Sequence, residues 1–263
     1  MGKETEQKQE IVNQGVHTYS QEEAYVWPEE PVLREQLEWF QDQKLALMVH
    51  WGVYNQLGMV ASWALSDEDA EWSRKTVDWT DDGEVFKRQY RALNRAFDPV
   101  AFQPEEWAKM AKECGFRYLI LTTKHHDGFC LWDTVYTEYK TTAEDCPFHT
   151  HKYADIVRAM FDAFRKEKLG IGVYYSKADW HCPDYWEKEK VFTGKTTRNP
   201  TYNPKENPEA WERFRAFTRD QILELGKQYG RLDILWFDAG WVAATNGQDI
   251  RLGEIVEEVR KTQ

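Results

Sequence analysis

Several features that would assign this sequence to a class at once are missing. No apolar run approaches the roughly 20 residues that a membrane-spanning helix needs. The four cysteines form no CxxC pair and no metal-type spacing, so we expect free thiols in a reducing compartment. Residues 1–10 are polar and lack the apolar core of a secretory signal, which favours a cytoplasmic location.

Positive charge is also scarce, because 34 Lys and Arg stand against 45 Asp and Glu, for a formal net charge of -11. Such an acidic chain repels nucleic acids and anionic membranes, so neither is expected as a partner. Aromatic residues, in contrast, are abundant: 13 Trp, 13 Tyr and 13 Phe. Many of them belong to a packed core, but the surplus of Trp also suits the binding of sugars, whose C–H faces stack on aromatic rings.

The order of apolar segments predicts one α/β domain over residues 26–263, preceded by a polar segment at 1–25. Continuous apolar runs predict strands near 44–49, 117–124, 170–176 and 231–238. Helical periodicity predicts helices over 31–43, 83–93, 104–114, 153–168, 208–229 and 249–261. Strands that alternate with helices form right-handed βαβ units, so all four strands should end at the same rim of a parallel sheet.

Two details of this prediction concern burial. The run at 231–238 has the continuous apolar character of a strand buried on both faces. In the helix at 104–114, Trp107, Met110 and Ala111 share the face that we expect to be buried. The segments 53–98 and 177–208 are long, irregular and rich in Trp, and loops of this length in compact domains are usually functional.

Each predicted strand ends on residues able to bind or react. These are His50 and Trp51, then His125, His126 and Asp127, then Tyr174, Tyr175 and Asp179, and finally Trp236 and Asp238. Barrel enzymes keep their chemistry at this rim. Polar and aromatic groups at four strand ends therefore predict one shared pocket.

Asp238 is the candidate catalytic nucleophile, since it ends an apolar run between aromatic residues. An aspartate at this position could instead cap a helix or be a loop residue whose hydrogen bonds are satisfied within the loop. Trp236 and Phe237 beside it favour a shaped pocket.

The pair His125 and His126 can reach one pocket only if the strand ends there, because adjacent side chains of a strand point to opposite faces. The turn signal Asp127-Gly128 predicts that end. One core and one exposed histidine would be the alternative. A metal site built from both histidines, His50 and Asp238 is a weaker alternative, since the chain has neither HxH nor HExxH; no metal or other cofactor is predicted.

Four blocks of sequence, in this order, resemble the α-L-fucosidases of glycoside hydrolase family 29. They are VHWG at 49–52, LTTKHHDGF at 121–129, GVYYS at 172–176 and LWFD at 235–238. The resemblance, from about residue 39 to 241, implies a retaining exo-glycosidase on a (β/α)8 TIM-barrel-like fold. Such an enzyme hydrolyses terminal α-L-fucose from oligosaccharides or glycoconjugates by double displacement. The resemblance also implies that Asp238 forms the covalent glycosyl-enzyme and that fucose is bound by His50, Trp63, His125, His126, Tyr174 and Trp236.

The chain departs from the family in two ways. Many members have Glu-Trp after His-Trp-Gly, whereas this chain has Ser62-Trp63, with Glu71-Trp72 as a second candidate nine residues later. We also count about four βα units, truncated relative to a full barrel, and the family's acid/base glutamate comes from a later strand. We therefore expect the chain as given to be poorly soluble or inactive unless it forms a homo-oligomer or is completed.

Two further functions stay open at this point. One is a non-catalytic fucose-binding paralogue, which the Ser62 departure and the missing acid/base residue both allow. The other is a metal-dependent hydrolase on a barrel.

Overall fold

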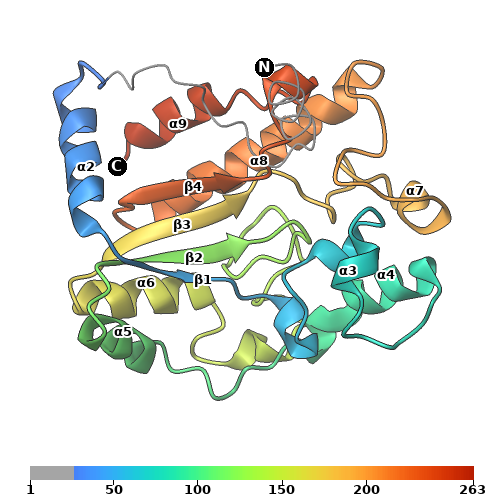
Figure 1. Cartoon of the computed structure of the whole chain (residues 1–263), viewed down its shortest axis with the longest axis horizontal. Helices are drawn as coiled ribbons and strands as arrows, with labels where there is room; N and C mark the ends of the chain where they lie inside the picture. Colours follow the sequence, from blue (N-terminus) through green and yellow to red (C-terminus); the bar gives the residue numbers. More distant parts are fainter. Residues whose placement is uncertain (1–26) are drawn as a thin grey trace, which may run out of the picture.

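The fold is a four-stranded parallel sheet with helices packed along it, seen in a computed structural model that describes residues 27–263 (Figure 1). The predicted polar segment 1–25 lies outside the described residues. The strands are β1 (Ala46–Val49), β2 (Tyr118–Lys124), β3 (Gly170–Ser176) and β4 (Ile234–Asp238), paired in the order β1-β2-β3-β4. All pairings are parallel, so the four carboxyl ends lie at one edge, as the arrowheads in Figure 1 show.

Helices connect the strands and precede the first of them. The longer ones are α2 (Pro31–Gln43), α5 (Pro104–Glu113), α6 (Ile156–Lys166), α8 (Pro208–Gln228) and α9 (Leu252–Arg260). Proline occupies the first turn of α2, α5 and α8, where its missing N–H has no intrahelical partner to lose. Helix α6 begins three residues later than predicted, because the Asp155 carboxylate accepts a hydrogen bond from the Arg158 N–H and caps the helix there.

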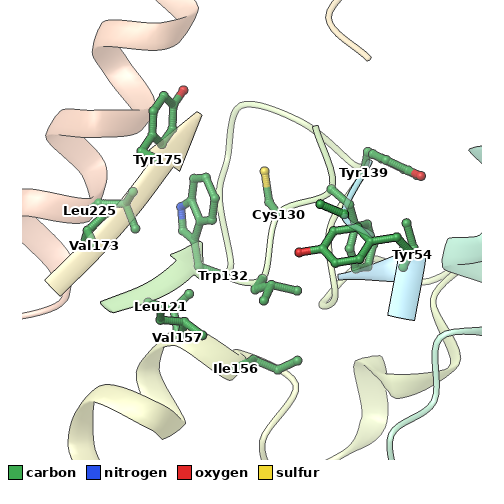
Figure 2. Close-up of a cluster of buried hydrophobic side chains, with 14 of the residues drawn as sticks. Tyr54, Leu121, Cys130, Trp132, Tyr139, Ile156, Val157, Val173, Tyr175 and Leu225 are labelled. Atoms are coloured by element: carbon green, nitrogen blue, oxygen red, sulfur yellow. The ribbon is translucent and has the colours of Figure 1, made fainter. Parts of the chain in front are cut away.

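The main core lies between one face of the sheet and the helices. Figure 2 shows Trp132, Leu121, Val157, Val173 and Leu225 gathered in this core, and all five are buried. The predicted inner face of α5 was wrong at Met110, whose side chain is 50% exposed, whereas Ala108 and Ala111 are buried. Small side chains let α5 approach the neighbouring α6 closely, so the buried face is centred on the alanines rather than on the methionine.

Strand β4 differs from its prediction in burial. Leu235 and Phe237 pack against the main core, but Trp236 on the opposite face is 47% exposed. Within residues 27–263, β4 pairs only with β3, so the expectation of a strand buried on both faces was wrong. The run is apolar throughout because Leu235 and Phe237 pack against the main core, while Ile234 packs against a small second cluster on the opposite face.

Short helices occupy the two long Trp-rich segments, where the sequence predicted only one. These are α3 (Ala70–Ser73), α4 (Gly83–Arg91) and α7 (Lys188–Thr193), with 3-10 turns at Val53–Leu57, Trp63–Leu65 and Ala92–Ala96; further 3-10 turns are Pro147–Thr150 and Ala244–Asn246. Elements of three to six residues carry too few periodic positions to be predicted. Helices α3, α4 and α7 lie beyond the carboxyl ends of the strands (Figure 1).

Hydrogen bonds to one carboxylate tie these segments to each other. The Asp67 carboxylate accepts hydrogen bonds from Arg74, Lys87 and the Thr196 N–H, so the first long segment is fixed to the second. Within the described part of the chain, no helix is long and apolar enough to cross a membrane.

Candidate active site

A β-bulge near the end of β2 determines which side chains enter the site. Thr122 pairs with Tyr174 but Lys124 pairs with Tyr175, so β2 carries one extra residue at Thr123. The bulge turns Lys124 toward the helix-covered face, where it hydrogen-bonds to Tyr175 and to Gln221 of α8. The strand then stops, and the two following histidines lie together.

His125 and His126 occupy one place in the fold, with ring centroids 4.2 Å apart. Both side chains are buried, and the ring of His125 stacks on Tyr174 at 5.7 Å with an interplanar angle of 6°. His50, at the end of β1, packs edge-on against Tyr174 at 5.0 Å and lies 5.7 Å from His125. Three neighbouring strands thus supply one continuous group of rings.

Asp238 completes this group at the end of β4. Its Oδ2 accepts a hydrogen bond from the Tyr174 hydroxyl and lies 3.6 Å from Nε2 of His126. Its Oδ1 accepts a 2.6 Å hydrogen bond from the N–H of Ala239, a buried residue held at φ 67°. The carboxylate caps no helix, and its side chain is 35% exposed, so a ligand can reach it.

Trp63 forms an aromatic wall on the other side of the histidines. Its ring lies 4.8 Å from His126 and 6.1 Å from His125. The alternative pair, Glu71-Trp72, lies farther out: both residues are exposed, and the Trp72 ring touches Trp63 at 6.5 Å.

Trp236 is the predicted site residue that lies at the margin of this group of rings. It lies next to Tyr174 in the register of β3 and β4, two residues before Asp238, and so faces the same side of the sheet. No ring contact joins it to the other site residues in the part of the chain that the structure describes. Its exposed ring is available to a ligand on that side.

Sequence reasoning missed three residues at the aromatic wall: two tryptophans that extend it and one arginine that packs on it. The rings of Trp180 and Trp241 lie 5.0 and 5.1 Å from His126. The guanidinium of Arg198 lies 4.9 Å from the centre of the Trp63 ring and pairs with Asp69 through two hydrogen bonds. The abundance of Trp in the long segments was the only signal, because no periodicity links these residues to the strand ends.

Electrostatically, the Asp238 carboxylate lies among histidine and tyrosine side chains that are uncharged at neutral pH, with the Arg198–Asp69 pair at the aromatic wall. Burial lowers the pKa of His125 and His126 well below 6.5, and desolvation also lowers the pKa of His50, against the opposing charge of Asp238. Burial and the Asp238 charge raise the pKa of Tyr174 far above 10. At neutral pH the site therefore presents neutral imidazoles and a phenol, which can both donate to and accept from hydroxyl groups.

Behind the site lies a buried ion pair. Lys124 Nζ is 2.8 Å from Asp179 Oδ2, with both side chains at most 2% exposed. Asp179 Oδ1 accepts from the N–H groups of His181 and Cys182, while the Trp180 N–H donates to the His126 carbonyl at 2.7 Å. Tyr175 and Asp179, which the sequence placed at the rim, thus support the site from the helix-covered side.

Asp127 also makes its hydrogen bonds outside the pocket. Its carboxylate accepts from the Tyr90 hydroxyl and from the Phe129 N–H, and burial raises its pKa to about 6. This arrangement fixes the turn that follows the two histidines.

His125, His126 and Asp238 have ligand atoms that all lie within 4.8 Å of one another. Three nitrogen and oxygen donors are what a catalytic zinc ion takes from a protein. His50, which the sequence alternative included, is not in this group. The same atoms could therefore hold a divalent cation or bind the hydroxyl groups of a sugar.

The buried histidines predict acid sensitivity of the fold. In the unfolded chain they titrate near 6.5, whereas the folded pKa values of His125 and His126 lie well below that and burial lowers the pKa of His181 to about 4. Below pH 6.5 the unfolded state binds more protons than the folded state. The free energy of unfolding should therefore decrease as the pH is lowered, by on the order of 1.4 kcal/mol per pH unit for each histidine. Asp127 opposes this between its unfolded value of 3.8 and about 6, because its ionisation costs stability.

Urea titrations at several pH values check this expectation. The contribution of these groups to the free energy of unfolding should not change with pH above 6.5 and should decrease as the pH is lowered below 6.5. His181→Gln should make this decrease shallower. The exposed His149→Gln, for which no burial cost is removed, serves as the control. A slope that is unchanged in His181→Gln would contradict the prediction.

Comparisons with known proteins agree on one family. The family model described as Alpha-L-fucosidase matches residues 12–263. The tissue α-L-fucosidase of Rattus norvegicus is 27% identical over 203 residues, which cover 77% of this chain and 39% of that protein. The plasma α-L-fucosidase of Homo sapiens is 26% identical over 223 residues, covering 84% of this chain and 46% of that protein. The chain thus spans less than half the length of these relatives.

Solved structures are similar in fold. α-L-fucosidase isoenzyme 1 from Paenibacillus thiaminolyticus superposes with a TM-score of 0.66 at 32% identity, covering 87% of this chain and 48% of that one. The Lactobacillus casei α-L-fucosidase AlfC, in complex with its α-L-fucose product, superposes with a TM-score of 0.63 at 29% identity, covering 87% and 67%. These similarities and the four-stranded parallel sheet confirm the predicted barrel-like α/β fold over about four βα units.

Proposed function

Because this chain belongs to the α-L-fucosidase family, we propose that its site serves the hydrolysis of terminal α-L-fucosides with Asp238 as the nucleophile. The observation that supports this most is the place of the Asp238 carboxylate. It lies at a strand end, partly open to solvent, and is held by the Tyr174 hydroxyl and the Ala239 N–H.

The reaction that fits this carboxylate is a double displacement. An Asp238 oxygen attacks C1 of the fucosyl unit, the bond from C1 to the leaving oxygen breaks, and a general acid protonates that oxygen. Water then attacks C1 of the ester, loses its proton to the same acid/base group, and releases fucose and free Asp238. The hydrogen bond from Tyr174 keeps one carboxylate oxygen oriented, so that the lone pair of the other can attack.

A retaining mechanism needs a second carboxyl group about 5–5.5 Å from the first. No second carboxylate contacts Asp238, Tyr174 or either pocket histidine by a hydrogen bond or ion pair within residues 27–263. We therefore assign the acid/base role to no residue of the site described above. Substrates with a good leaving group reduce the need for that proton and allow the first displacement to be tested by itself.

The rings of the site suit the sugar. Neutral imidazoles of His50, His125 and His126 match its hydroxyl groups, and the wall of Trp63 and Trp241 offers an apolar surface for its methyl group. We propose fucosylated oligosaccharides or glycoconjugates as the substrate class.

The test combines binding with turnover. The chain is titrated with L-fucose and then assayed with 4-nitrophenyl α-L-fucoside, with the β-anomer as the control. Release of nitrophenol from the α-anomer alone supports the proposal and, if it comes from a monomer, contradicts the expectation that the chain as given is inactive. Saturable L-fucose binding with no release would instead select the non-catalytic fucose-binding reading, which Ser62 in place of the family's glutamate favours.

The metal reading has its own observation, the cluster of His125, His126 and Asp238. Dialysis against a chelator distinguishes the two chemistries. We expect binding of L-fucose and any turnover to stay unchanged, because the histidines act as hydrogen-bonding groups. Loss of activity with the chelator and recovery with zinc would replace the glycosidase proposal by a metal-assisted hydrolysis.

A further inference from the structure

The hydrogen bond between His126 and Ser176 determines which nitrogen of this imidazole carries the proton. The Ser176 hydroxyl lies 2.8 Å from the Ala178 carbonyl, an atom that can only accept, so the hydroxyl donates its single proton there. The same oxygen must therefore accept a hydrogen bond from its other partner, Nδ1 of His126. Nδ1 therefore carries the hydrogen, and in the neutral ring Nε2 is bare.

That bare nitrogen points into the site. Nε2 of His126 is buried, makes no hydrogen bond to any residue in 27–263, and lies 3.6 Å from Oδ2 of Asp238. A lone pair and a carboxylate oxygen, both acceptors, thus face each other. Asp238 Oδ2 already accepts from the Tyr174 hydroxyl, but only a group that brings a proton can satisfy His126 Nε2, and a buried acceptor left without a donor costs free energy.

His125 receives the opposite assignment from Ser62. The Ser62 hydroxyl lies 2.5 Å from Nδ1 of His125, is fully buried, and has no other hydrogen-bond partner in the described structure. If Nδ1 carried the hydrogen, the Ser62 proton would have no acceptor. Ser62 therefore donates to a bare Nδ1, and the hydrogen of His125 is on Nε2.

We propose that Ser62 and Ser176 are positioning residues that hold the adjacent histidines in opposite tautomers, so that the site offers one donor and one acceptor to neighbouring hydroxyl groups of the bound sugar. The donor is Nε2–H of His125 and the acceptor is Nε2 of His126. The part of this inference that concerns the sugar rests on the proposed function, whereas the tautomers themselves do not. Ser62, a departure from the family's glutamate, thereby has a role in the site.

Two consequences follow for what the site binds. A ligand that places a hydroxyl on His126 must donate to it, so a methyl ether at that position leaves the nitrogen unpaired and is rejected. Only one of the two Nε2 atoms is free to ligate a metal, since the other carries hydrogen. Opposite tautomers therefore favour a polyhydroxyl ligand over a cation.

The experiment is nitrogen NMR on the full chain labelled with ¹⁵N-histidine, without ligand, at pH 7.5. Long-range proton–nitrogen spectra distinguish protonated from bare ring nitrogens, and His125→Gln and His126→Gln identify the two rings. We expect His126 with a protonated Nδ1 and bare Nε2, and His125 with the reverse. Either ring with the other pattern, or with both nitrogens protonated, overturns the proposal.

Variants then test the serines. Ser62→Ala and Ser176→Ala should each convert their own histidine to a mixture of tautomers, while Ser62→Thr and Ser176→Thr, which keep a hydroxyl, should retain the pattern. Thr218→Val removes a buried hydroxyl of α8 outside the site and is the control. Unchanged histidine spectra in both alanine variants would overturn the proposal, and the spectrum of the unmodified chain decides it if the variants do not fold.

Titration with L-fucose separates this inference from the proposed function. We expect Ser62→Ala and Ser176→Ala to bind L-fucose about threefold to tenfold more weakly than the unmodified chain. Predicted tautomers with no fucose binding would refute the sugar assignment and leave the roles of the serines standing. Fucose binding with the wrong tautomers would do the reverse.

Discussion

Replacement of Asp238 by glycine should abolish hydrolysis of an aryl α-L-fucoside while L-fucose still binds. Removing the nucleophile of an enzyme that works through a covalent intermediate costs up to about 10⁶-fold in kcat. The histidines and Trp63 remain in place, since they are held by contacts other than Asp238, such as those of Ser62 and Ser176. Turnover is measured as nitrophenol release and binding by calorimetry.

Azide adds a positive signal to this loss. In Asp238→Gly the small anion can occupy the space of the missing carboxylate and attack C1, giving a fucosyl azide of inverted configuration and restoring nitrophenol release. Asp162→Ala, which removes an exposed carboxylate from α6, is the control and should behave like the unmodified chain. A glycine variant that keeps more than a tenth of the rate without azide would contradict the nucleophile assignment.

The second large effect is expected on stability, at the buried pair behind the site. Lys124→Met leaves Asp179 as an uncompensated charge in the core, and such changes cost about 3–5 kcal/mol of the free energy of unfolding. The double variant Lys124→Met/Asp179→Leu should recover a large part of that loss, because neither charge is then buried. Urea denaturation of the unmodified chain, Lys124→Met, Asp179→Leu and the double variant measures the cycle.

A surface pair supplies the matched control. Lys190 and Glu187 are 2.6 Å apart, with side chains that are 55% and 35% exposed, so Lys190→Met should cost no more than about 1 kcal/mol. Equal losses in Lys124→Met and Lys190→Met would show that the interior pair is not the support that its burial indicates. The Lys124 variant should also lose L-fucose affinity, since Asp179 fixes the loop whose Trp180 N–H holds the His126 backbone.

The sequence predicted the arrangement of strand ends well because one rule governs it. Parallel βαβ units bring His50, His125, Tyr174 and Asp238 to one edge whatever the loops do. The turn signal after His126 likewise predicted that two adjacent histidines can share a pocket. These are local patterns that need no knowledge of distant contacts.

The missed features all depend on contacts between segments far apart in the chain. Trp180, Trp241 and Arg198 reach the site through loops whose course is set by pairs such as Asp69 with Arg198, 129 residues apart. The bulge at Thr123 and the exposure of Trp236 depend on which strands pair on each side. Ser62 could be noticed only as a departure from the family, and its contact with His125 gave that departure a physical meaning.

Trapping the covalent intermediate would test the assignment of Asp238 as the nucleophile most directly. A 2-deoxy-2-fluoro-α-L-fucosyl fluoride has a good leaving group, and its fluorine at C2 slows the second displacement, so the ester on the nucleophile should accumulate. Peptide mass spectrometry should then find one added fluorofucosyl unit, on Asp238, that is absent from Asp238→Gly. A label on a different carboxylate, or fluoride release at full rate from a protein that never becomes labelled, would contradict the assignment of Asp238 as the nucleophile.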